Sequence, residues 1–229
     1  MELLVVIAIV ALMATAGGPA VTALVSSGGA NENLNQLSGI LEQARQYAVS
    51  QNTYVWVAFY PQTVNGVKQV SVAVIASTDG TDPASNNGVN WQTYSYGNLT
   101  PNGSLALVNK IVTLKQVSLQ NAATYTSSTT PKVSSLPLNP AVTSSNGVAT
   151  NTSGNGFFQI QLPGPANTSP VAFSQAIQFT PSGQAQNSSS PVGVIDLDIL
   201  PQKGNVDNLN SVAVLRINGL TGETALYRE

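Results

Sequence analysis

Three successive patterns of apolar and polar residues divide the chain. Leu3–Val25 is almost wholly apolar, and one charge, Glu2, precedes it. From Asn31 to Asn52 apolar residues recur at spacings of three and four, which predicts an amphipathic helix. After Asn52 the period shortens towards two, which predicts strands. The apolar stripe of the predicted helix consists of Leu34, Leu37, Leu41, Ala44 and Ala48.

The apolar run has the length of a membrane-spanning helix. Its 23 residues would extend about 35 Å at about 1.5 Å each, against a bilayer core of about 30 Å. A signal peptide or a plain membrane anchor is the simplest interpretation. A signal peptide, however, begins with basic residues, and here the start carries an acid. Gly17, Gly18 and Pro19 interrupt the run with weak helix formers.

Strand signals cover the remainder. Val67–Ala76 follows Thr53–Tyr60 across Asn65-Gly66, which predicts a hairpin. Residues 77–104 are rich in turn residues and predict a long loop with one short strand over 91–96, and 105–119 predicts a strand or strand pair. Residues 124–156 are rich in Ser, Thr, Asn and Pro and predict an extended surface segment. Further strands are expected at 157–162, 174–180, 192–200, 211–218 and 223–228.

Composition narrows the function. The 229 residues suit one helix and one globular domain of about 180 residues. Charged residues make up 8% of the chain, eight basic against ten acidic, so no basic surface is expected for nucleic acid. Cysteine and histidine are absent, which excludes disulfides and thiolate sites and removes the commonest general base. We therefore expect no enzyme, no catalytic residues and no cofactor.

Several motifs resemble the type IV pilins and type II secretion pseudopilins. Glu2 followed by the apolar run is similar to the start of the mature proteins, and Pro19 lies seventeen residues on, where many members have proline. LEQARQYAVSQNTYVWVAF resembles the passage from helix to first strand in H-type pseudopilins and FimT-like pilins. IQFTPSG and LRINGLTGETALYR resemble later parts of the same domain. The family has four residues before the glutamate and this chain has one, so the leader, its cleavage site and the methylated N-terminal residue are not read from it.

The resemblance and the patterns together predict an α+β fold. A long N-terminal α-helix, apolar in its first half and amphipathic in its second, would pack on an antiparallel β-sheet domain with long loops. Residues 1–30 would form the transmembrane and filament-core helix. Residues 31–229 would form the globular domain, with the amphipathic helix over 31–52 and the sheet over 53–229. A coiled-coil partner for the stripe is an alternative, but two heptads favour packing on the sheet.

The resemblance further implies a structural subunit of a helical filament, either a type IV pilus or a pseudopilus. Partners would be other copies of the chain, the assembly machinery and a prepilin peptidase. The chain would wait in the bacterial inner membrane and then enter an extracellular or periplasm-spanning filament. Glu2 would pair with the terminal amine of a neighbouring subunit. The implied assembly residues are Glu2, Leu3, Leu4, Val5, Val6, Ile7, Ile9 and Pro19.

Gly17, Gly18 and Pro19 have two interpretations. A kink follows from the residues alone, whereas the resemblance implies local unwinding of the helix inside a filament. Arg45 lies in the passage from helix to first strand and is expected to cap or bridge at the border between helix and sheet.

Asp196, Asp198 and Asp207 are the weak candidates for a metal site. Asp196 and Asp198 are two apart on a predicted strand and therefore share a face, with Asp207 in a nearby loop. Three carboxylates could hold Ca²⁺, and some related G-type pseudopilins bind it near their C-terminus. A polar strand face is the preferred interpretation.

A binding module is the alternative function. The chain could be a minor or tip pilin, or a membrane-anchored adhesin, with its long loops as the ligand surface. DNA uptake, known for some FimT-like proteins, would need a basic stripe, and the lysines are scattered. Five Asn-x-Ser/Thr sequons are explained by chance in so Asn-rich a chain, and glycosylation is the weaker hypothesis. They lie at Asn98, Asn102, Asn151, Asn167 and Asn187.

Overall fold

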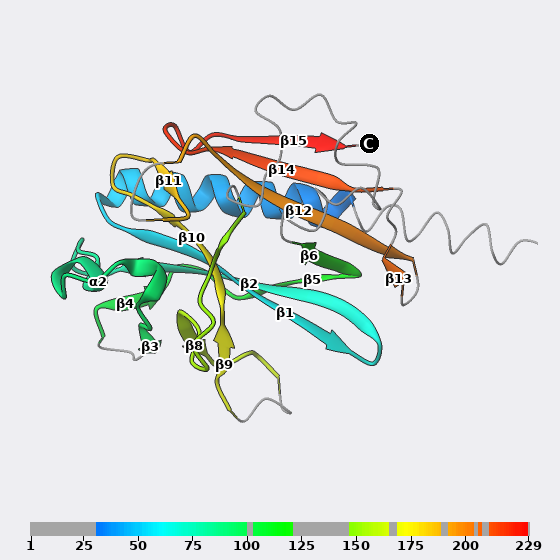
Figure 1. Ribbon diagram of the computed structural model, residues 1–229, viewed down its shortest axis with the longest axis horizontal. Coiled ribbons are helices and arrows are strands. Elements are labelled where there is room, and N and C mark those ends of the chain that lie inside the picture. The colour runs from blue at the N-terminus through cyan, green and yellow to red at the C-terminus, as the bar shows by residue number, and fades with distance from the viewer. Residues whose placement is uncertain are drawn as a thin grey trace, which may run out of the picture.

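Strand β1 (Val55–Val64) is the centre of the architecture, because its first half is buried on both faces. The computed structural model describes residues 31–99, 103–120, 147–164, 169–188, 192–203, 206–207 and 211–228. Within them a helix over residues 31–51 precedes β1, and the chain then forms three sheets. Figure 1 shows the helix running between the sheet of β1 and β2 and the sheet of β12, β14 and β15.

The first sheet is antiparallel and has seven strands, with β11, β10, β1, β2 and β4 side by side. Strand β5 also pairs with β2, and β7 pairs with β10. Besides β1, its strands are β2 (Val67–Ser77), β4 (Leu105–Leu107), β5 (Val112–Lys115), β7 (Ala149–Thr150), β10 (Gln175–Phe179) and β11 (Ala185–Gln186).

Two smaller sheets lie against the first. The five-stranded sheet has the order β13, β12, β14, β15, and β6 pairs with β12. Its strands are β6 (Val117–Gln120), β12 (Val194–Lys203), β13 (Val206–Asp207), β14 (Ala213–Asn218) and β15 (Thr224–Arg228). The third sheet consists of β3 (Gly97–Asn98), β8 (Phe158–Ile160) and β9 (Val171–Phe173). A short helix α2 (Pro83–Asn86) and a 3-10 turn η1 (Trp91–Thr93) precede β3.

The predicted fold class is wrong. The expectation was a long N-terminal helix, apolar and then amphipathic, packed on a sheet. The described residues are mostly β-sheet, 46% strand and 18% helical, and their N-terminal helix has 21 residues and is not apolar. The prediction gave the helix too much weight because seven of the described strands have only two or three residues. Such strands are too short to show an alternating pattern.

The hairpin between β1 and β2 is confirmed. Val64 pairs with Val67, and Asn65 and Gly66 take φ values of 52° and 79°. Two consecutive positive φ values are typical of a type I′ turn, whose twist matches that of the strands. By contrast, the short strand expected over 91–96 is wrong, because η1 occupies 91–93 and residues 94–96 belong to no strand.

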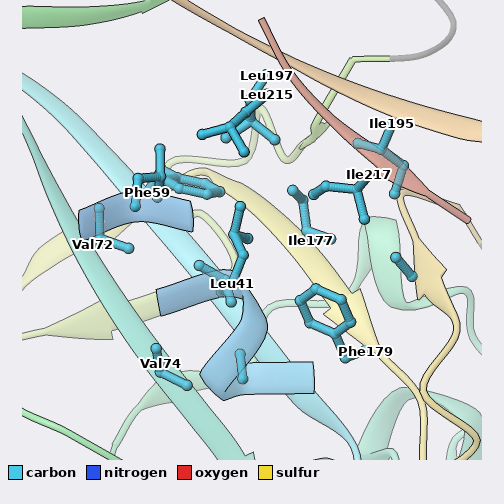
Figure 2. Close-up of a cluster of buried hydrophobic side chains, with 14 of the residues drawn as sticks. Leu41, Phe59, Val72, Val74, Ile177, Phe179, Ile195, Leu197, Leu215 and Ile217 are labelled. Atoms are coloured by element: carbon cyan, nitrogen blue, oxygen red, sulfur yellow. The ribbon is translucent and has the colours of Figure 1, made fainter. Parts of the chain in front are cut away.

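The stripe of the amphipathic helix is buried as predicted. Leu34, Leu37, Leu41, Ala44 and Ala48 are 0–3% exposed, so a coiled-coil partner has no apolar stripe to meet. They pack into one core with side chains from β1, β2, β10, β12 and β14. Figure 2 shows Leu41 from the helix surrounded by Phe59, Val72, Val74, Ile177, Phe179, Ile195, Leu197, Leu215 and Ile217. The helix ends at residue 51, and Asn52 follows with a φ of 49°, the left-handed conformation common after helices.

The opposite face of the first sheet carries a second core. Trp56 and Ala58 alternate along β1 with Val55, Val57 and Phe59 of the first core. Trp56 packs there against Tyr96 and Phe158, with ring centroids 5.1 and 6.0 Å away. A strand buried on both faces reads as a continuous apolar run, which accounts for the sequence TYVWVAFY.

We predict that Leu41→Ala lowers the free energy of unfolding by about 2–5 kcal/mol, because Leu41 is fully buried between the two sheets and truncation leaves a cavity. Urea denaturation followed by circular dichroism measures the change. Val49→Ala on the same helix is the control, since Val49 is 50% exposed and its truncation should leave stability nearly unchanged. Equal losses in the two variants would contradict this description of the core.

Candidate functional site

The predicted assembly residues lie outside the described part of the chain. This applies to Glu2, Leu3, Leu4, Val5, Val6, Ile7 and Ile9, and equally to the predicted helix break at Gly17, Gly18 and Pro19. Among the residues that the structure describes, no helix combines the length and apolar character needed to cross a membrane. The sites described below therefore belong to the globular domain, and the first of them holds the start of its N-terminal helix.

Two hydrogen bonds fix the first turn of the helix to the domain. Arg228 of β15 donates from Nη1 to Oδ1 of Asn31 at 2.5 Å. On another strand, the carbonyl oxygen of Lys115 accepts a hydrogen bond from Nδ2 of Asn33 at 2.8 Å. The sequence analysis missed both contacts, because the four residues are separated by 82 and 197 positions in the chain.

Arg45 bridges the helix and the last hairpin, as expected. Its Nε and Nη2 donate to Glu42 at 3.0 and 2.6 Å, and Nη1 donates to the carbonyl oxygen of Thr221 at 3.4 Å. The hydrogen bond from Arg45 lowers the pKa of Glu42. The Arg45 stem packs so closely on Gly222 that a Cβ there would lie 2.6 Å from Cδ. The bridge thus fixes the angle between helix and hairpin.

An open polar pocket of about 400 Å³ lies at this bridge, between the helix and the hairpin. Its lining consists of Ser38, Glu42, Arg45, Thr221, Glu223 and Thr224. Because the Arg45 guanidinium is already engaged by Glu42 and Thr221, it serves here to hold two elements together.

We predict that Gly222→Ala destabilises the protein by about 1–3 kcal/mol. The residue has a φ of 68°, which a side chain rarely adopts, and a Cβ would lie 2.2 Å from the carbonyl oxygen of Gly183. Gly39→Ala is the matched control, because Gly39 is an exposed helical residue with no atom within 4 Å of the added Cβ. It should stabilise by about 0.5–1 kcal/mol. Chemical denaturation of both variants measures the difference, and a stabilised Gly222→Ala would contradict the close packing.

The weak metal candidates Asp196 and Asp198 share one face of β12, as predicted, but Asp196 is already engaged. Both its oxygens accept from Arg216 of β14, at 2.7 Å from Nε and 2.9 Å from Nη2. The Arg216 and Asp196 side chains are 7% and 0% exposed. This buried, bidentate ion pair has the fixed geometry of a structural link.

Asp198 lies on the same face and is fully buried. Neither oxygen of its carboxyl group has a hydrogen-bond partner among the described residues. The pKa of Asp198 is raised to about 7, chiefly by burial and secondly by the charge of Asp196, while the charge of Arg216 opposes the shift. Burial therefore favours the neutral form of this carboxyl group.

Asp207, the third candidate, belongs to another site. It accepts a hydrogen bond from Nζ of Lys68 at 2.6 Å and one from the hydroxyl of Ser118 at 3.3 Å. In the described part of the chain, no three acidic, histidine or cysteine residues lie together as a metal site requires. Asp196 and Asp207 therefore serve separate ion pairs, and the three carboxyl groups do not form one site.

We predict that Asp198→Asn removes a pH dependence of stability. Below about pH 4 the group is protonated in both states, and above about pH 7 it is ionised in both. Between these values only the unfolded state is ionised, so the free energy of unfolding of the wild type falls as pH rises from 4 to 7. The variant should be more stable than wild type at pH 8, on the order of a few kcal/mol, and similar to it near pH 4.

Denaturation at the two pH values measures this effect. Asp196→Asn is the contrasting variant, because it leaves Arg216 buried without its carboxylate and should lose about 3–5 kcal/mol at both pH values. A stability gain of Asp198→Asn that is equal at pH 4 and pH 8 would contradict a raised pKa.

Asp82 forms a buried polar node that the sequence analysis missed. It is 4% exposed and accepts from the backbone N–H of Ala84, the hydroxyl of Tyr96 and the amide of Gln178, at 2.9–3.0 Å. Burial and the charge of Asp82 raise the pKa of Tyr96. The Asp82-Pro83 pair is typical of the N-cap of a helix and is found there in α2. No local sequence pattern predicts the contacts of Asp82 with Tyr96 and Gln178. This node fixes residues 82–96 to the first sheet.

The five Asn-x-Ser/Thr sequons differ in whether their asparagine is exposed. The side-chain amides of Asn151 and Asn187 are buried and donate to the carbonyl oxygens of Tyr94 and Gly147. Neither amide is therefore accessible to a modifying enzyme in the folded protein. Asn98 is exposed on β3, and Asn102 and Asn167 lie outside the described residues.

Comparison of the chain with family models, with curated proteins and with solved structures finds no match.

Proposed function

We propose that the protein is a structural subunit of a helical filament of the type IV pilus or pseudopilus kind, assembled through its N-terminal hydrophobic segment. The observation that carries the proposal is the apolar run Leu3–Val25, headed by the single acid Glu2 and interrupted at Pro19. A plain membrane anchor requires neither of these two residues. The subunit would wait in the inner membrane before it enters the filament.

The burial of the amphipathic stripe supports this use of the N-terminal segment. The stripe from Leu34 to Ala48 is 0–3% exposed within its own domain, so it is not available for contacts between subunits. The preceding apolar run, Leu3–Val25, would make these contacts instead. Bundling of these runs from many copies would remove them from water and from lipid. The domain would then be displayed on the outside.

The charge of Glu2 also supports the proposed assembly into a filament. Glu2 in an apolar bundle is stable only with a partner, and the terminal amine of a neighbouring subunit would supply one. The contact between Glu2 and another copy is heterologous, and a heterologous contact that does not close gives an open helical filament. The net charge of −2 on 229 residues also keeps repulsion low between domains packed side by side.

We predict that Glu2→Ala leaves the subunit in the membrane fraction but abolishes or severely reduces filaments, because the buried amine loses its carboxylate. Electron microscopy and gel analysis of sheared surface material measure filament yield and show whether this chain is the dominant band. Glu32→Ala is the matched control, because Glu32 is an exposed carboxylate in the first turn of the described helix, and its filament yield should be normal.

Normal filaments in the Glu2→Ala variant would refute the charge pairing. A trace band of this chain in otherwise normal filaments would instead favour a minor subunit with a binding role. A chain that remains in the membrane under conditions of filament production would favour an anchored adhesin.

A further inference from the structure

The end of the domain at which the chain enters is formed by contacts between distant segments. Lys115 of β5 accepts from Asn33 of the helix and pairs in register with Gln69 of β2. The adjacent Lys68 forms an ion pair with Asp207 of β13 at 2.6 Å. Figure 1 shows the start of the described helix, the end of β15 and strand β13 at the same end of the molecule. We call this end the entry face: Val64, Lys68, Lys115, Val206, Asp207 and Arg228.

The entry face exposes apolar side chains beside charged ones. Val206 is 71% exposed and Val64 is 45% exposed, and both lie next to hairpin turns. Lys115 and Arg228 are both exposed and both contact the first turn of the helix, Lys115 through its carbonyl oxygen and Arg228 through its guanidinium. Of these charges, Lys68 is paired with Asp207, whereas Lys115 and Arg228 form no ion pair within the described part of the chain. Exposed valines with long cationic side chains beside them suit the boundary between headgroups and hydrocarbon.

The length of the connecting chain limits the distance between this face and the apolar run. Val25 and Asn31 are six residues apart, which corresponds to at most about 20 Å of fully extended chain. The headgroup layer adds about 5–7 Å on each side of the hydrocarbon core. If Leu3–Val25 spans the bilayer, as the proposed function requires, the entry face must lie close to the lipid surface.

We propose that the entry face is a membrane-contact surface, with Val206 and Val64 in the headgroup region and Lys115 and Arg228 against lipid phosphates. This inference rests on the membrane stage of the proposed function. The contact holds the subunit upright on the bilayer before assembly, and it is released when the subunit leaves the membrane.

Single-cysteine labelling tests this contact, because the native chain has no cysteine. Full-length Val206→Cys is labelled with an environment-sensitive fluorophore and reconstituted into vesicles of phosphatidylethanolamine and phosphatidylglycerol. Leu220→Cys is the matched control, because Leu220 is 62% exposed at the opposite end of the β14–β15 hairpin. Spin-labelled lipid should quench the label at position 206 several-fold more than the label at position 220. Adding Lys115→Glu and Arg228→Glu should reduce the quenching at 206.

Equal quenching at the two positions in membrane-integrated protein would overturn the inference and leave the proposed function intact. A blue-shifted label at 206 in detergent solution that grows with protein concentration would also overturn it, because the face would then meet a second copy. Release of the chain from the vesicles by alkaline carbonate would refute the membrane stage itself, and the inference with it.

Discussion

The burial of one helical stripe between two sheets is the contact on which the rest of the structure depends. Leu37 and Leu41 contribute to a core that also contains β1, β2, β10, β12 and β14, so the helix holds together strands separated by more than a hundred residues. Burial of apolar surface stabilises a fold by about 25 cal/mol per Å², and this chain has few charges and no cysteine to form disulfides. The helix, the first sheet and the second sheet are therefore one unit.

This dependence separates the roles of the two apolar patterns at the N-terminal end. The stripe from Leu34 to Ala48 is buried within the domain, whereas the proposed function assigns Leu3–Val25 to the membrane and then to the filament. Under that proposal, folding and assembly would use different apolar surfaces.

The sequence predicted those elements whose pattern is long. The stripe, the β1–β2 hairpin and strands β10, β12, β14 and β15 all have at least five residues with recognisable periodicity or turn signals. It failed on β3, β7, β9, β11 and β13, because two or three residues carry no period and their pairing depends on distant partners. The prediction also gave the N-terminal helix too large a share of the fold, and for that reason the predicted fold class was wrong.

The candidate site residues were likewise predicted only where a local pattern exists. The shared face of Asp196 and Asp198 follows from the alternation of a strand, and it was predicted. The pairing of Asp196 with Arg216 and of Asp207 with Lys68 depends on strand order, which no local pattern encodes. The role of Asp82 as a buried acceptor was missed for the same reason. The sequence thus predicted which side chains share a face of one element, but it did not predict the contacts between elements.

The Asp196–Arg216 pair has a consequence for how the second sheet selects its alignment. Ile195, Leu197 and Ile199 of β12 alternate with the two aspartates, and Leu215 and Ile217 of β14 alternate with Arg216. A shift of one residue in β14 would exchange these faces and place the guanidinium among aliphatic side chains, away from its carboxylate. An unpaired buried charge is costly enough to exclude that alignment. The ion pair therefore specifies the register between β12 and β14, whatever its net contribution to stability.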